Sequence, residues 1–209
     1  MSTPPPLESG NHTHANASII LLHGLGADGH DLLPLAQSLA HPDWRFILPD
    51  APVQHISLYG GQAMPAWYDI RHPNLLFEQD EAGFVRARQW VADWISREVA
   101  RGVTPQRIVL AGFSQGGAVA IYSGLTLNLP LAGIAGLSTY VPELLPANTL
   151  PPVWLAHGSE DNIIPLDSFQ RSLSRLPQPA VSCQTYPMTH SICTQEIDDL
   201  RTWLTSLLA

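Results

Sequence analysis

The sequence is poor in cysteine. It holds two thiols, Cys183 and Cys193, among 209 residues, which is too few for a disulfide framework. A chain of this length buries enough apolar surface to fold without a covalent bridge, so we expect both cysteines to be free. Hydrophobic residues make up 45% and charged residues 13% of the chain, which is typical of a globular protein with few surface charges.

Positive charge is also scarce. Ten Lys and Arg residues stand against 18 Asp and Glu residues, the net charge is −8, and the sequence contains no basic cluster. This balance argues against nucleic acid and anionic membrane surfaces as partners. No apolar run is long enough to span a bilayer, and the N-terminus, Met1-Ser2-Thr3-Pro4, lacks the basic and apolar regions of a secretory signal. We therefore predict a cytoplasmic protein without integral membrane association.

Neither an internal repeat nor an interdomain linker is visible in the sequence. Residues 1–16 are rich in Pro, Asn, His and Thr and are predicted to form a flexible N-terminal segment. Residues 17–209 are predicted to form a single domain, which their number allows.

Short apolar runs alternate with longer segments of helical periodicity. This alternation predicts an α/β protein with a mostly parallel central sheet and helices on both faces. Strands are expected at residues 18–23, 45–48, 107–112, 131–137, 153–157 and 181–186. Helices are expected at residues 31–39, 80–101, 115–127, 166–175 and 194–208. Residues 51–77, rich in Pro, Gly and aromatic residues, break the pattern and are expected to form a long, irregular, functional excursion.

A G-x-S-x-G motif supplies the strongest chemical signal. It directly follows an apolar strand and opens a predicted helix, and its central residue is Ser114, between Gly112 and Gly116. A serine on so tight a strand-to-helix turn needs neighbours without side chains two positions away on either side. The helix that follows directs its N-terminal N–H groups at the site where an oxyanion would form. A glycine-rich turn without catalytic function remains the alternative until partners for the serine are found.

A base and a carboxylate follow in the order that this kind of site requires. A serine hydroxyl needs an imidazole to take its proton, and the imidazole needs a carboxylate to fix its tautomer. His190 lies between the last predicted strand and the last helix, and Asp161 lies in the loop after residues 153–157. Glu160 is the local competitor for the carboxylate role. The other downstream histidine, His157, precedes the carboxylates of that loop, and we interpret it as structural.

The first predicted strand ends in a glycine-rich loop that allows two interpretations. Gly24, Gly26 and Gly29 match the bare G-x-G-x-x-G spacing of dinucleotide-binding loops, with Asp50 as the acidic partner. No other dinucleotide feature accompanies them. The same loop can instead provide a backbone N–H group that completes an oxyanion hole with the residue after the nucleophile. We favour the second interpretation.

Taken together, these motifs resemble the phospholipase/carboxylesterase family, which includes small bacterial carboxylesterases and acyl-protein thioesterases. The resemblance runs from about Ile19 to the C-terminus and rests on His23-Gly24-Leu25-Gly26, Pro49-Asp50-Ala51-Pro52, Met64-Pro65-Ala66-Trp67-Tyr68-Asp69, Gly112-Phe113-Ser114-Gln115-Gly116-Gly117, His157-Gly158 with Asp161, and Met188-Thr189-His190. Relatives often carry glycine before the catalytic histidine, where this chain has Thr189.

The resemblance implies an α/β-hydrolase fold without a large cap domain. It assigns Ser114, Asp161 and His190 to a catalytic triad, and the backbone N–H groups of Leu25 and Gln115 to the oxyanion hole. It also suggests a homodimer. The implied reaction proceeds through an acyl-enzyme and needs neither a metal nor an organic cofactor.

The implied function is that of a serine carboxylesterase acting on short- to medium-chain acyl esters. An acyl-protein thioesterase, which acts on an acylated protein, is the alternative in the same class, and a non-catalytic binding protein of the same fold is the alternative in another class. For substrate binding we expect Leu75, Leu76 and Phe77 to form an apolar lip over the acyl pocket, with Trp67 nearby. The alternative is that these three residues cover the core beneath the following helix.

Overall fold

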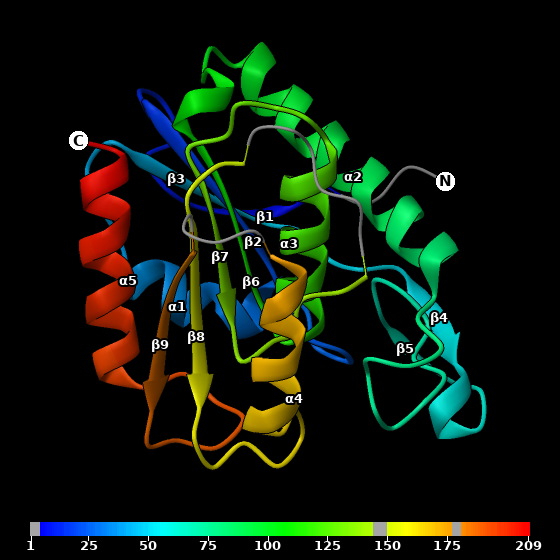
Figure 1. Cartoon of the computed structure of the whole chain (residues 1–209). Coiled ribbons are helices and arrows are strands. Elements are labelled where there is room, and N and C mark those ends of the chain that lie inside the picture. Colours follow the sequence, from blue (N-terminus) through cyan, green and yellow to red (C-terminus); the bar gives the residue numbers. More distant parts are fainter. Residues whose placement is uncertain (1–4, 144–149, 177–180) are drawn as a thin grey trace.

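The computed structural model describes residues 5–143, 150–176 and 181–209. Its centre is a seven-stranded sheet in the order β1-β3-β2-β6-β7-β8-β9, in which β1 is antiparallel to β3 and all other neighbours are parallel (Figure 1). The strands are β1 (Leu7–Gly10), β2 (Ala17–Leu22), β3 (Trp44–Leu48), β6 (Ile108–Phe113), β7 (Gly133–Leu137), β8 (Val153–Gly158) and β9 (Val181–Tyr186). The mostly parallel sheet confirms the fold class expected from the sequence.

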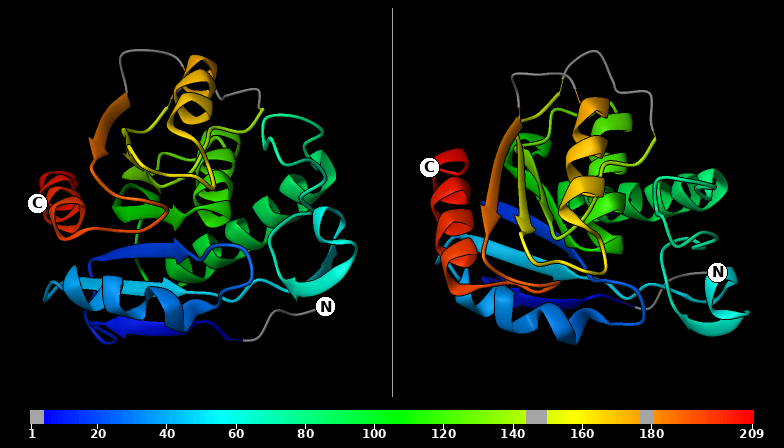
Figure 2. Two further views of the ribbon diagram at one scale, coloured as in Figure 1. Left: turned by 90° about the horizontal axis from the view of Figure 1, so that it is seen from below. Right: turned by 60° about the horizontal axis from the view of Figure 1, so that its bottom comes forward.

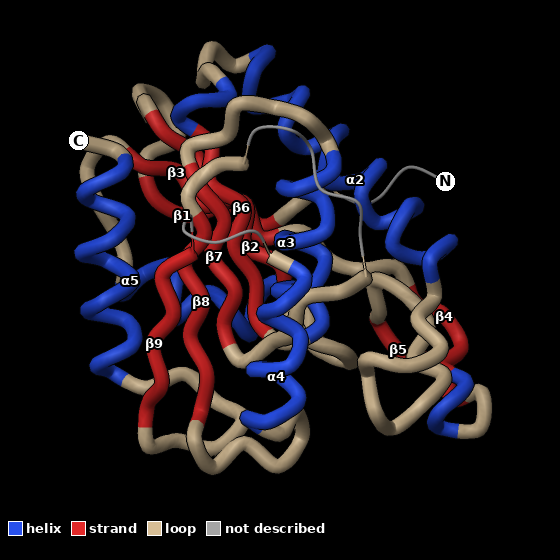
Figure 3. The backbone as a smooth tube through the Cα atoms, viewed as in Figure 1, coloured by secondary structure: helices blue, strands red, loops and turns tan. Residues whose placement is uncertain are grey.

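Helices cover both faces of the sheet, as Figures 2 and 3 show. Helices α1 (Leu33–Ser38) and α5 (Thr194–Leu207) pack on one face, and α2 (Glu81–Ala100), α3 (Gln115–Thr126) and α4 (Leu166–Ser172) pack on the other. Strands β2, β3, β7 and β8 are buried along their whole length, because both of their faces meet helices. Every predicted strand and helix is present with ends shifted by a few residues. Of the helices in the described ranges, none combines the length and apolar character that a membrane crossing requires.

The N-terminal segment is more ordered than the sequence suggested. Of the predicted flexible residues 1–16, residues 1–4 lie outside the described part of the chain, but Leu7–Gly10 forms β1 and pairs with β3. This strand lies at the edge of the sheet and pairs with one neighbour, and most of its residues are only half-buried. Its sequence therefore shows no alternation of apolar and polar residues from which a strand could be predicted.

The excursion at residues 51–77 is a folded hairpin with a compact loop. Strands β4 (Val53–Ile56) and β5 (Gln62–Pro65) form a separate antiparallel sheet, set apart from the main sheet beside the N-terminal end of α2 (Figure 1). The hairpin turn passes through Gly60 and Gly61, whose positive φ angles of 64° and 83° favour glycine. No large cap domain covers the sheet within the described ranges.

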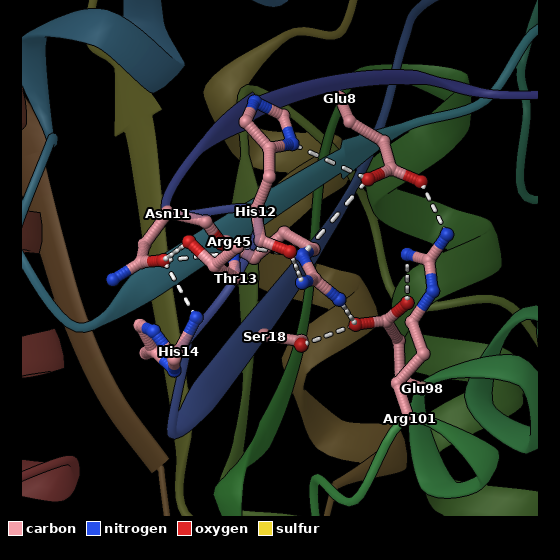
Figure 4. A network of polar contacts seen from close by, with 9 residues as sticks. All are labelled: Glu8, Asn11, His12, Thr13, His14, Ser18, Arg45, Glu98 and Arg101. Atoms are coloured by element: carbon pink, nitrogen blue, oxygen red, sulfur yellow. Dashed lines mark hydrogen bonds and ion pairs between the residues drawn. The ribbon is translucent and has the colours of Figure 1, made fainter.

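A buried polar network ties β1 to the body of the domain (Figure 4). Glu98 of α2, 2% exposed, accepts a hydrogen bond from the Ser18 hydroxyl at 2.6 Å and lies 3.4 Å from an Arg45 guanidinium nitrogen. Arg101 bridges Glu98 at 2.9 Å to Glu8 of β1 at 2.8 Å. Each carboxylate oxygen of Glu98 therefore has a cationic partner, which a buried charge requires.

Alanine in place of Glu98 is expected to lower the free energy of unfolding by about 3–5 kcal/mol, because the buried Arg45 loses its closer and more buried anion and, among the described residues, keeps only Glu8 at 3.9 Å. Urea denaturation of both proteins measures the difference. Asp93→Ala on the exposed side of the same helix is the matched control and should change the stability by less than about 0.5 kcal/mol. Equal stability of Glu98→Ala and wild type would show that the network contributes nothing.

Candidate active site

The sequence-predicted site residues meet at the carboxyl ends of the parallel strands. Ser114 follows β6, Asp161 follows the end of β8, and His190 follows β9. The arrows of β6, β8 and β9 point toward the same edge of the sheet in Figure 1. The glycine-rich loop after β2 meets Ser114 there, because β2 and β6 are neighbours. From β2 the chain continues to β3 on one side and then to β6 on the other, so the strand order reverses between β2 and β6. Open α/β sheets bind their ligands at such a point.

Ser114 sits on a strained turn between β6 and α3. Its φ of 53° and ψ of −118° lie in a region that residues with a side chain rarely adopt. The turn is held by two hydrogen bonds: the Ser114 N–H donates to Leu137 O at 2.9 Å, and the Thr139 hydroxyl donates to Ser114 O at 2.7 Å. A methyl group on Gly116 would collide with the backbone carbonyls of Leu22 and His23, so the motif needs glycine here for close packing of α3 on β2.

The three side chains form a continuous hydrogen-bonded relay. The Ser114 hydroxyl lies 2.9 Å from His190 Nε2, and His190 Nδ1 lies 2.7 Å from Asp161 Oδ2. The carboxylate accepts from Nδ1–H, which leaves Nε2 as the acceptor for the serine hydroxyl. An imidazole in this state can take a proton from the serine as its oxygen attacks a carbonyl.

Asp161 is fixed by its own loop. Its Oδ1 accepts from the backbone N–H groups of Ile163 at 2.9 Å and Ile164 at 2.8 Å, which leaves Oδ2 for His190. Glu160, the competing carboxylate, is exposed and takes no part in this arrangement. Of the two acidic neighbours, the geometry brings only Asp161 into contact with the imidazole.

His157, interpreted from the sequence as structural, supports this loop. The side chain is fully buried, it stacks on Phe169 with ring centroids 4.4 Å apart, and its Nε2 lies 2.7 Å from Ile164 O. It also lies 3.6 Å from Asp161 Oδ2. Burial lowers the pKa of His157, so the ring is neutral at neutral pH and donates its one proton to the Ile164 carbonyl. No sequence pattern points to this contact, because its acceptor is a backbone atom.

Leucine in place of His157 is expected to lower kcat about 10-fold and the free energy of unfolding by about 1–3 kcal/mol, because the buried Ile164 carbonyl loses its donor. Glutamine should retain most of both values, since its amide nitrogen can reach the position of Nε2. Steady-state kinetics and urea denaturation of both variants measure the effects. Equal losses in the two variants would refute a role for the hydrogen bond.

Hydrogen bonds to neighbouring segments hold the loop after β2 in place. The buried ring of His23 accepts a hydrogen bond from the Ala51 N–H at 2.9 Å through Nε2, so its Nδ1 donates to Gly24 O at 2.7 Å. Burial lowers the pKa of His23 and keeps it in this neutral form. The Gly26 N–H donates to Pro65 O of β5 at 2.8 Å. In the described ranges, the N–H groups of Leu25 and Gln115 donate to no protein atom, so both remain available to a substrate oxygen.

Asp50 does not act as a ribose-binding acid in this structure. Its carboxylate accepts from the Gly29 N–H at 2.8 Å and so joins the glycine-rich loop to the segment after β3. In the described ranges no group of three or more His, Cys, Asp or Glu side chains is arranged to hold a metal ion.

A cavity of about 730 Å³ opens beside Ser114 and has mostly apolar walls. Its volume lies within the range of sites that bind small molecules. Besides Ser114 and His190, its walls include apolar residues from the loop after β2, from the hairpin and the segment that follows it, and from the loop after β8. They are Leu25, Leu58, Ile70, Leu75, Ile163 and Ile164. A second hollow of about 260 Å³ adjoins it and shares Leu75, Ile163 and Ile164.

The four residues expected to bind substrate are placed differently from one another. Leu75 lines the main cavity and Leu76 the second hollow, both packed against the core, whereas the exposed Phe77 lines neither. Trp67 is fully buried and is absent from both walls. It instead braces the site: its indole N–H donates to His23 O at 2.8 Å and its backbone N–H donates to the Gln115 side chain at 2.9 Å.

The model of the phospholipase/carboxylesterase family matches residues 7–208. The chain belongs to this family. Acyl-protein thioesterase 1 of Cryptococcus neoformans is 39% identical over 221 residues, which cover 92% of each chain. The protein of the same name from Neurospora crassa is 36% identical over 225 residues, which cover 98% of this chain and 92% of that one.

Solved structures agree with the family assignment. Arabidopsis thaliana SOBER1 superposes with a TM-score of 0.84 at 27% identity, covering 93% of this chain and 100% of that one. Zea mays acyl-protein thioesterase 2 superposes with a TM-score of 0.82 at 26% identity, covering 97% and 98%. Membership in the phospholipase/carboxylesterase family and the α/β-hydrolase fold identify the chain as a hydrolase of esters or thioesters.

Proposed function

We propose that this family member is a serine carboxylesterase that cleaves short- to medium-chain acyl esters through an acyl-enzyme on Ser114. The observation that carries the proposal is the relay Ser114–His190–Asp161, with contacts of 2.9 and 2.7 Å, at the wall of an apolar cavity. In this proposal the ester carbonyl lies against Ser114 and the acyl chain occupies the cavity.

The first half of the reaction forms the acyl-enzyme. As the Ser114 oxygen attacks the carbonyl carbon, its proton passes to His190 Nε2, and Asp161 stabilises the imidazolium that results. The oxyanion receives hydrogen bonds from the N–H groups of Leu25 and Gln115, each contributing about 3 kcal/mol in comparable sites. The C–O bond then breaks, and His190 returns the proton to the leaving alcohol.

The second half releases the acid. Water loses a proton to His190 Nε2 and attacks the acyl carbonyl, and the collapse of this second intermediate returns the proton to the Ser114 oxygen. No step needs a metal or an organic cofactor. The cytoplasmic location and the homodimer stay predictions.

Acyl-protein thioesterase activity is the second candidate, and the names of the relatives that are 39% and 36% identical favour it. A thiolate is a better leaving group than an alkoxide, and the triad chemistry is the same for both. The leaving group lies outside the acyl cavity, so the same site can serve both substrates.

Matched oxygen and sulfur esters separate the two candidates. We expect hydrolysis of 4-nitrophenyl esters to peak at a short to medium acyl length, and the same length to be preferred in alkyl thioesters and in an S-acylated cysteine peptide. Higher kcat/KM for the peptide than for small esters of the same acyl group would favour the thioesterase. Failure to hydrolyse any of these compounds would overturn both candidates and favour a non-catalytic binding protein.

A further inference from the structure

Two buried tyrosines form a hydrogen-bonded pair in the wall of the cavity, and the triad does not use them. The hydroxyl groups of Tyr68, which follows β5, and Tyr140, which follows β7, lie 2.8 Å apart. Both residues are 2% exposed, and both line the cavity that Ser114 lines. Burial raises the pKa of both phenols, so each keeps its proton at neutral pH.

The pair is held in place by its surroundings. The Tyr68 ring stacks on Phe84 of α2 with centroids 4.1 Å apart, and the Tyr68 carbonyl accepts from the Gln115 side chain at 2.9 Å. The residue after Tyr140, Val141, donates its N–H to the Ser172 hydroxyl at 2.9 Å. Both phenols are therefore fixed by packing and by neighbouring backbone contacts.

One of the two O–H hydrogens of the pair has no acceptor among the residues that the structure describes. Each phenol has a single O–H, and one of the two hydrogens is taken by the contact between them. In the described ranges neither hydroxyl has a further protein partner, so the second hydrogen has no protein acceptor. A buried donor without an acceptor is unfavourable, and a cavity with a few placed polar groups uses them to select its ligand.

We propose that the Tyr68–Tyr140 pair is a polar subsite that selects acyl chains carrying an oxygen acceptor, such as an ether, keto or hydroxyl oxygen. This inference rests on the proposed function, because it places the acyl chain in the cavity. A plain hydrocarbon chain that fills the cavity leaves the spare O–H unpaired, whereas a chain with an oxygen at the right position accepts from it. Of two acyl chains of equal length, the pair therefore favours the one that carries the oxygen.

The test compares isosteric acyl chains. A series of 4-nitrophenyl esters carries one ether oxygen in place of one methylene, moved stepwise along the chain, and each member is paired with the all-methylene ester of the same length. We expect the ratio of kcat/KM, oxygen-bearing over hydrocarbon, to reach about 10 at one position in the wild type, which is the worth of one hydrogen bond.

Phenylalanine variants assign the effect to the pair. In the double variant Tyr68→Phe/Tyr140→Phe the peak should disappear, and the two single variants show which hydroxyl donates. Removing both hydroxyls together leaves no unpaired partner, so the double variant should fold. Tyr59→Phe makes the same change on an exposed tyrosine of the same cavity wall and should keep the peak.

Two outcomes overturn the inference. They are a flat series in the wild type and a peak that survives in the double variant. Each of them leaves the hydrolysis of hydrocarbon esters, and with it the proposed function, intact. If the wild-type protein shows no ester hydrolysis that depends on Ser114, the proposed function itself fails.

Discussion

Alanine in place of Ser114 is expected to lower kcat by about a million-fold, to a residual rate supported by the remaining site alone. The hydroxyl lies 2.9 Å from His190 Nε2, and no other hydroxyl makes a hydrogen bond to that imidazole in the described part of the chain. Ester hydrolysis, followed by 4-nitrophenolate release from a short-chain ester, measures the loss.

Ser123→Ala provides the matched control for this variant. Ser123 lies on the same helix, α3, and its buried hydroxyl has no hydrogen-bond partner within the described residues. Its removal should leave kcat unchanged and cost little or no stability. A Ser114→Ala protein that folds and still turns over the ester at a tenth of the wild-type rate would exclude Ser114 as the nucleophile.

Asparagine in place of Asp161 is expected to lower kcat by about 10⁴-fold while the protein stays folded. The N–H groups of Ile163 and Ile164 hold the Oδ1 position at 2.9 and 2.8 Å, so the asparagine carbonyl takes that place. Its amide NH₂ then faces His190 Nδ1 at the former Oδ2 position. A donor there selects the tautomer with the proton on Nε2, which cannot accept from the serine.

The neighbouring carboxylate gives the control. Glu160→Gln makes the same chemical change one residue away, at an exposed side chain, and should leave kcat within two-fold of wild type. Kinetics of both variants on one ester decide the matter. If the Glu160 variant loses activity and the Asp161 variant keeps it, the carboxylate has been assigned to the wrong residue.

The elements of the site could be predicted from the sequence because each follows a parallel strand of the central sheet. The order Ser114, Asp161, His190 along the chain maps directly onto neighbouring loops at one edge of the sheet. What carried the prediction was the steric demand of the G-x-S-x-G turn and the chemistry of the base and acid. These are local requirements, and a sequence displays them.

Long-range contacts explain what the sequence did not reveal. Trp67 was expected near the acyl pocket, in a segment rich in Pro and Gly, but its indole N–H donates to the carbonyl of His23 and the residue is fully buried. Strand β1 is held by main-chain pairing, which leaves no pattern in the side chains. Of the expected apolar lip, Leu75 lines the cavity whereas Phe77 is exposed and does not line it, and neither periodicity nor composition distinguishes these two residues.

Covalent labelling tests the central claim, a nucleophilic Ser114, most directly. The protein is incubated with 4-nitrophenyl diethyl phosphate, which transfers a diethylphosphoryl group to an activated serine, and is then analysed by intact mass and peptide mapping. One adduct per chain, located on Ser114, formed in step with the loss of esterase activity and absent from the His190→Ala protein, is the predicted result. A fully active protein after exposure to the reagent, or an adduct on another residue that accounts for the inactivation, would contradict it.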